Sequence, residues 1–171
     1  MSIREKNRFH NAEFSGKING MINGQSTGII PDLRYGLFSM SYNGCEVIAV
    51  YNALLYSGKN IPLYEVSYIM EKHRILLGAF GSNPYCFDKL GDSLSLKAER
   101  IYKTDGISAF IISLWCGKPF FSGIHTMFCI PDKGRITVYN RYNQDIHERI
   151  YPDFKSFAGN RKIISIYSVA V

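Results

Sequence analysis

Three residue types that can act together on an acyl group are spread along this chain: a thiol, an imidazole and an amide. Cys45 opens a dense apolar run that ends at Gly58. His125 and Asn140 lie 15 residues apart, on the two flanks of a turn signal at 132–135. A thiol beside an imidazole is a nucleophile with its base, and an amide carbonyl can fix the orientation of the ring. The spacing predicts acyl transfer through a cysteine, provided that the fold brings the three side chains together.

The apolar run predicts a buried helix over 45–57. It is too long for an ordinary strand, contains good helix formers and stops at Gly58, a residue type that commonly follows a helix. Cys45 then lies in the first turn, where unpaired N–H groups and the positive end of the helix dipole favour a thiolate. Paired with His125, the Cys45 thiol is expected to have a pKa well below the usual value of about 8.5. Glu46 is expected only to complement the helix N-terminus.

The turn signal at 132–135 predicts a hairpin of the strands 125–130 and 135–140, which places His125 near Asn140 at its open end. Before the hairpin, the spacing of apolar residues predicts helices over 63–72, 84–90 and 107–115, and a short strand near 97–102. A strand over 119–123, a short helix near 152–157 and a strand over 162–171 complete the expected elements. Helices first and an antiparallel sheet later indicate an α+β fold, with the buried helix packed on the sheet.

The first 34 residues are expected to form an N-terminal arm, partly flexible, ahead of one domain over 35–171. Asn-Gly pairs at 19–20 and 23–24 predict turns, with a small hairpin as one arrangement. A chain of 171 residues that is 46% hydrophobic and 20% charged is long enough for one well-buried domain.

Composition excludes several classes of function. The net charge of +6 comes from basic residues that are scattered along the chain, which favours a solvated surface over a nucleic-acid site. The wide spacing of Cys45, Cys86, Cys116 and Cys129 argues against a zinc site, and we expect neither disulfides nor a cofactor. No apolar run approaches 18 residues and no secretory signal is visible, so we expect no membrane association and a cytoplasmic location.

The chain resembles the papain-like cysteine peptidases, nearest the compact bacterial branch that includes the leader-cutting peptidases of bacteriocin exporters. The resemblance covers about 35–171 and rests on the helix-opening Cys45, on 123–125 (Gly-Ile-His) and on 138–140 (Val-Tyr-Asn). His125 follows Cys45 by 80 residues and Asn140 follows it by 95. The corresponding distances in papain itself are about 130–150, so the compact branch is the better match.

The resemblance implies a papain-like fold and a Cys45-His125-Asn140 triad that hydrolyses peptide or side-chain amide bonds. The expected partner is a peptide or protein substrate. This chain has Ser39 where the family usually has a Gln that donates to the oxyanion, and Asn140 where the leader-cutting branch commonly has Asp. Asn43, together with the backbone N–H of Cys45, is the expected replacement donor, and Gln25 is a more remote one.

Two classes of function remain open from the sequence. The first is a thiol hydrolase, within which proteolysis cannot be separated from deamidase or transglutaminase chemistry. The alternative is a catalytically inactive papain-fold binding module that keeps the scaffold without turnover. The two differ in whether Cys45 reacts as a nucleophile.

Overall fold

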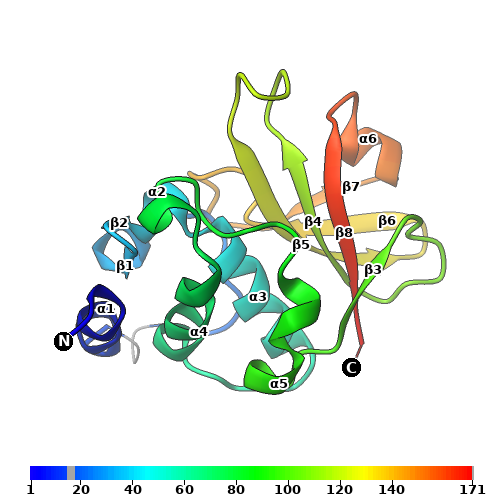
Figure 1. Ribbon diagram of the computed structural model, residues 1–171. Coiled ribbons are helices and arrows are strands. Elements are labelled where there is room, and N and C mark those ends of the chain that lie inside the picture. The colour runs from blue at the N-terminus through cyan, green and yellow to red at the C-terminus, as the bar shows by residue number, and fades with distance from the viewer. Residues whose placement is uncertain (15–17, 171) are drawn as a thin grey trace.

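The computed structural model describes residues 1–14 and 18–170 as N-terminal helices packed on a C-terminal six-stranded antiparallel sheet. The longer helices are α1 (Ile3–Ala12), α3 (Cys45–Tyr56) and α4 (Leu63–Met70). The shorter ones are α2 (Met40–Asn43), α5 (Gly91–Leu94) and α6 (Phe154–Ala158), with the 3-10 turns η2 (Ile30–Asp32), η3 (Glu71–His73), η4 (Leu76–Gly78) and η5 (Phe87–Leu90). Figure 1 shows α1 to α5 on one side of the molecule and the sheet, with α6 beside it, on the other. This arrangement confirms the predicted α+β class.

The large sheet has the strand order β3-β8-β4-β5-β6-β7. Its strands are β3 (Ala98–Ile101), β4 (Phe110–Trp115), β5 (Ile124–Asp132), β6 (Arg135–Tyr139), β7 (Arg149–Tyr151) and β8 (Ile163–Val169). A separate two-stranded pair, β1 (Arg34–Tyr35) with β2 (Phe38–Ser39), precedes α2. The predicted hairpin is confirmed, since β5 and β6 pair antiparallel from Phe128↔Tyr139 to Asp132↔Arg135.

Helix α3 is the centre of the helical half, as predicted. All of its residues from Cys45 to Leu54 are buried, because α4 packs on one side of it and strands β4 and β5 on the other. A helix surrounded in this way needs an apolar surface around its whole circumference. The sequence of α3 has that surface, which is why the helix could be recognised from its composition alone.

The segment 107–115 was predicted as a helix, and this is wrong. Its residues 110–115 form β4, a central strand of the sheet. Phe110, Ile112 and Leu114 lie in the hydrophobic cluster that includes Phe157 of α6, whereas Ile111 lies in the cluster that includes α3. Both faces of the strand are therefore covered, and its apolar residues run without the alternation that marks a half-buried strand.

Two other predicted elements differ from the structure. The segment 119–123 was predicted as a strand, but it forms a turn before β5, with Phe120 at φ 65°. The small hairpin considered for the region around 19–28 is not formed in the described residues, which make turns there. Within the predicted arm, helix α1 carries a capping box in which the Ser2 and Glu5 side chains bond to each other's backbone N–H groups. Buried Asn7 on this helix donates to Gly36 O and to Glu71 Oε1, which ties α1 to the domain.

Candidate active site

Cys45 is the first residue of α3 and is 6% exposed. Gly44 precedes it as the helix N-cap and provides no side-chain cap. A Cβ at Gly44 would lie 2.1 Å from Cγ of Met40, so the short turn from α2 into α3 requires a glycine. The N–H groups of the first turn have no carbonyl partner within α3, so they are available to a negatively charged group near Cys45.

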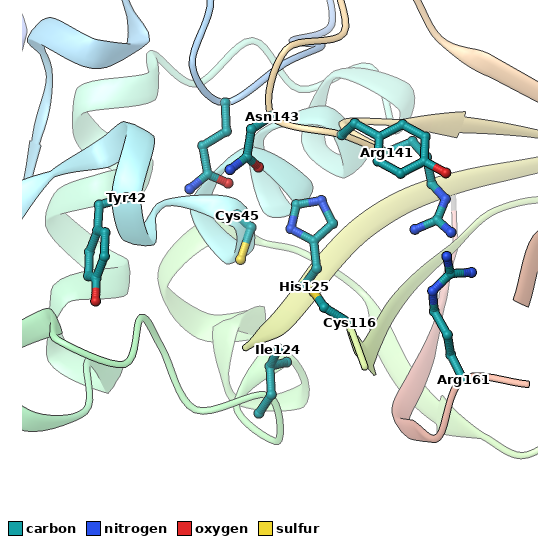
Figure 2. A pocket seen from close by; sticks show the side chains of 10 residues that line it. Tyr42, Cys45, Cys116, Ile124, His125, Arg141, Asn143 and Arg161 are labelled. Atoms are coloured by element: carbon teal, nitrogen blue, oxygen red, sulfur yellow. The ribbon is translucent and has the colours of Figure 1, made fainter. Parts of the chain in front are cut away.

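His125 lies on β5, next to the point where the strand leaves its pairing with β6. It pairs with Leu114 of β4, whereas the β5–β6 ladder begins only at Phe128. Its Nε2 is 2.5 Å from the backbone carbonyl oxygen of Asn140, which directly follows β6. Because a carbonyl can only accept, Nε2 carries the hydrogen, and the neutral ring keeps a lone pair on Nδ1. Figure 2 shows the ring beside the Cys45 side chain.

Asn140 holds the histidine through its main chain and not through the side-chain amide that the sequence suggested. Its φ of 58° turns the backbone so that the carbonyl faces His125. The side-chain Oδ1 instead accepts from the backbone N–H of Gln25 at 3.0 Å, and the Asn140 N–H donates to Asn23 Oδ1 at 3.2 Å. The predicted ring contact is therefore present, but it is made by a different atom.

Cys45 lies where two cavities meet. The first, of about 420 Å³, brings Cys45 and His125 together, and its other lining residues are Gln25, Tyr42, Cys116, Ile124, Arg141, Tyr142, Asn143 and Arg161. The second, of about 620 Å³, shares Tyr42, Cys45 and Ile124 with the first. Its remaining lining is mostly apolar and includes Ile75, Phe80, Trp115 and Phe120. A chain bound across both cavities would pass over the thiol.

The predicted low pKa of the thiol is wrong for this conformation. The Cys45 Sγ donates to Glu46 Oε2 at 3.3 Å, and burial followed by the Glu46 charge raises the pKa of Cys45 well above its ordinary value. Burial also raises the pKa of Glu46 from 4.5 to about 7. The pKa of His125 is lowered by burial and by the charge of Arg141, although the Asn140 carbonyl opposes this. At pH 7, both the thiol and the imidazole are therefore neutral in this conformation.

The expected oxyanion donor Asn43 is engaged elsewhere. Its Nδ2 donates to Tyr35 O at 3.0 Å and to Gly78 O at 2.6 Å, which uses both amide hydrogens to hold two backbone segments. Gln25, which the sequence offered only as a remote candidate, lines the first cavity together with Cys45. Its Nε2 donates to Ser41 O at 3.0 Å, which leaves one amide hydrogen free to donate. Gln25 is thus better placed than Asn43.

Ser39 stands where the family usually has its glutamine, and here it has a structural role. It is the N-cap of α2, and its hydroxyl donates to Pro31 O at 2.7 Å. It lines neither of the two cavities beside Cys45. Ser39 therefore supports the turn that leads into Cys45.

Sequence reasoning missed three charged residues of this site. Glu46 was assigned only to the helix N-terminus, although a carboxyl inside an otherwise apolar run signals a buried charge. Arg141 follows Asn140 directly, and Arg161 lies in the loop before β8. Nothing in the sequence places these two arginines in one cavity, because their proximity depends on the path of the chain through α6 to β8.

The residues that the structure describes include neither a candidate metal site nor a membrane-spanning helix. No group of three or more His, Cys, Asp or Glu side chains among them could hold a metal ion. All four cysteines are free, and Cys116 is exposed. Within 1–14 and 18–170, no helix is long and apolar enough to cross a membrane.

Comparisons with known proteins gave no match: no family model matches the chain, and no curated protein and no solved structure is significantly similar to it. The function is therefore argued from the geometry around Cys45.

Proposed function

We propose that this protein is a thiol hydrolase of the papain-like type that cleaves peptide or side-chain amide bonds. Cys45 is the nucleophile, His125 is the general base, and Asn140 orients the ring. The observation that carries the proposal is that Cys45, on the first turn of a buried helix, shares a cavity with His125, whose Nε2 bonds to Asn140 O. The order of helices and antiparallel sheet supports the papain-like fold on which the proposal draws.

The reaction uses the two ring nitrogens differently. Nδ1 of His125 takes the proton from the Cys45 thiol as the sulfur attacks the carbonyl carbon, and the Asn140 carbonyl stabilises the resulting imidazolium through Nε2–H. The negative oxygen of the tetrahedral intermediate accepts from the Cys45 backbone N–H and from Gln25. The imidazolium then protonates the leaving nitrogen, and the C–N bond breaks to leave a thioester. A water that loses its proton to His125 attacks the thioester, and the acid product leaves as the thiol is regenerated.

The neutral state of the unliganded pair has a consequence for this mechanism. Because burial and the charge of Glu46 raise the pKa of Cys45, the thiol is protonated at neutral pH, and in this mechanism its proton moves to His125 as the sulfur attacks. The same observation favours the second candidate, a catalytically inactive papain-fold binding module, since a thiol bonded to Glu46 is a poor nucleophile. Deamidation and transglutamination would use the same three residues with a different acyl donor or acceptor.

Labelling with an active-site-directed electrophile separates the two candidates. The exposed Cys116 is first changed to serine so that it does not react. The Cys116→Ser protein is then treated at pH 7.5 with a peptidyl vinyl sulfone, and the labelled residue is identified by peptide mass spectrometry. We expect labelling at Cys45, slowed about a hundredfold or more by His125→Ala, because a general base contributes at least that much.

Two controls accompany this experiment. Cys45→Ala should abolish labelling, and circular dichroism should show that His125→Ala remains folded. No labelling at Cys45, or a rate that His125→Ala leaves unchanged, would reject the hydrolase in favour of the binding module.

A further inference from the structure

Among the described residues, the first cavity is lined by a buried arginine that forms no ion pair. Arg141 is 5% exposed, yet among the described residues no carboxylate lies within ion-pair distance of it. Its Nε donates to the Tyr151 hydroxyl at 3.2 Å, and its guanidinium carbon lies 4.8 Å from the centre of the Tyr142 ring. Asp145 is ion-paired with Arg149, through bonds of 3.1 and 2.6 Å, and interacts with Arg141 only at longer range. A buried positive charge without a hydrogen-bonded counter-charge is costly, and a ligand can supply one.

A second arginine faces the first. Arg161 lines the same cavity, and Figure 2 shows the guanidinium groups of Arg141 and Arg161 directed toward each other. The protein contact of the Arg161 side chain is a hydrogen bond of 3.4 Å to the backbone carbonyl of Ala158. Two facing cations repel each other, and an anion between them would turn that repulsion into two charge-assisted contacts.

The neutral contacts of Arg141 hold its guanidinium in place before any ligand arrives. Its Nη1 contacts the Met127 sulfur at 3.7 Å, and the Phe157 ring centre is 5.5 Å from its guanidinium carbon. Less side-chain freedom is therefore lost on binding than for an exposed arginine. The second cavity, by contrast, is lined mainly by apolar and aromatic side chains. An anionic group would accordingly be directed to the Arg141 side of Cys45.

We propose that Arg141 and Arg161 form a carboxylate-binding subsite that selects substrates with an acidic group on one side of the scissile bond. The inference rests on the proposed hydrolase function and adds its substrate class. A carboxylate fits because the planar guanidinium binds it through two parallel hydrogen bonds. In a peptide it comes from an Asp or Glu side chain or from a free C-terminus, and both bring the same chemistry to this subsite.

The bound carboxylate would also act on the histidine. Burial lowers the pKa of His125, and the charge of Arg141 lowers it further. A carboxylate between the arginines offsets that charge, so the His125 pKa rises and the imidazolium that receives the Cys45 proton becomes more stable. Binding of the acidic group and activation of the thiol are therefore coupled through Arg141.

The test is cleavage of a peptide library of fixed length in which each position in turn carries Glu or Gln, with either a free or an amidated C-terminus. Products are quantified by mass spectrometry for the wild type, for Arg161→Gln and for Arg135→Gln. Arg135 is exposed and lines neither cavity, so its variant is a control for the change in net charge. Arg161 is half-buried, and its substitution should leave the fold intact.

We expect Glu to be preferred over Gln at one position by about 10- to 100-fold, as for the loss of a hydrogen bond to a charged group. Arg161→Gln should reduce this ratio toward one, and Arg135→Gln should leave it unchanged. A preference for the free C-terminus that depends on Arg161 in the same way would support the subsite with the terminal carboxylate as its ligand. Equal cleavage of the Glu and Gln peptides, or a preference that Arg161→Gln does not change, would overturn the inference while leaving the hydrolase intact.

A binding measurement separates failure of the subsite from failure of the hydrolase. The Cys45→Ala protein is titrated with the same Glu and Gln peptides by isothermal calorimetry. Tighter binding of the Glu peptide that is lost on Arg161→Gln would support the carboxylate subsite even if the wild type cleaves nothing. Equal affinities of the Glu and Gln peptides for Cys45→Ala would count against it.

Discussion

Glu46 is the buried carboxyl beside the candidate nucleophile, and replacing it with glutamine tests the electrostatics of the site. It is 3% exposed, accepts from the Cys45 thiol at 3.3 Å and has Thr126 Oγ1 at 3.5 Å. A Cβ on Gly81 would lie 2.8 Å from its Oε2, so the loop carrying Gly81 closes over the carboxyl. Burial raises the pKa of Glu46 from 4.5 to about 7. The dipole of α3 favours the charged form by only about 0.3–1 kcal/mol, so desolvation decides the direction.

The sign and size of the effect on stability follow from that pKa. The folded protein holds the Glu46 proton more tightly than the unfolded chain does, so the stabilisation is complete below pH 4.5. It is lost as the pH rises to and through about 7. The difference between 4.5 and 7 corresponds to about 3 kcal/mol of unfolding free energy. Glutamine does not titrate, so Glu46→Gln should gain about 3 kcal/mol relative to the wild type between pH 4.5 and pH 8.

The measurement is urea unfolding of both proteins at pH 4.5, 6, 7 and 8, because the difference between them cancels the titration of all other groups. Glu99→Gln, which changes an exposed carboxyl in the same way, is the matched control. The difference in unfolding free energy between Glu99→Gln and the wild type should vary by less than about 0.5 kcal/mol over this pH range. If the stability of Glu46→Gln relative to the wild type does not change with pH, or falls as the pH rises, the assignment of Glu46 as a desolvated carboxyl is refuted.

Three further predictions concern the neighbours of Cys45. Gln25→Ala should lower kcat on a cleaved peptide by about a hundredfold at unchanged KM, as for the loss of an oxyanion donor. Asn43→Ala should instead lower the unfolding free energy, measured in urea, by about 1–3 kcal/mol and leave the kcat of the folded protein unchanged. Asn140→Gly should label at Cys45 with the vinyl sulfone at a rate within about tenfold of the wild-type rate, because the main-chain carbonyl that bonds to His125 remains. Asn140→Ala, strained at φ 58°, should be about 1 kcal/mol less stable than the glycine variant in the same urea assay. Iodoacetamide at pH 7 should alkylate the exposed Cys116 before Cys45, as read by mass spectrometry; faster reaction at Cys45 would contradict the raised pKa of its thiol.

The elements that carry Cys45 and His125 could be predicted because their signals are local. The apolar run after Cys45 has the length and composition of a helix, and Gly58 ends it. The β5–β6 hairpin follows from the turn at Lys133 and Gly134, both of which have positive φ. These two elements bring Cys45 and His125 to one cavity, so the proximity of the two residues could be predicted without knowledge of the remaining strands.

What could not be predicted depends on tertiary contacts. The residues of β4 are buried on both faces by helices from distant parts of the chain, and their sequence is as compatible with a buried helix as with a strand. The contact of His125 with the Asn140 carbonyl depends on a backbone turn at positive φ, and the residue type alone does not determine which oxygen faces the ring. Helix α1 did have a local signal, the Ser2 and Glu5 capping box, but no apolar stripe followed to support it.

The charges around the candidate pair act in one direction. Burial raises the pKa of the thiol and lowers the pKa of the imidazole. The charge of Glu46 adds to the first shift and the charge of Arg141 to the second, so both charges oppose the thiolate–imidazolium pair. Offsetting either charge would favour the pair, although the effect of burial would remain. Under our proposal an acidic substrate does so, because its carboxylate offsets Arg141 while its backbone occupies the cleft over Cys45. Selectivity and activation would then have one physical origin, and an enzyme of this kind would cleave peptides without the acidic group more slowly even when they fit the cleft.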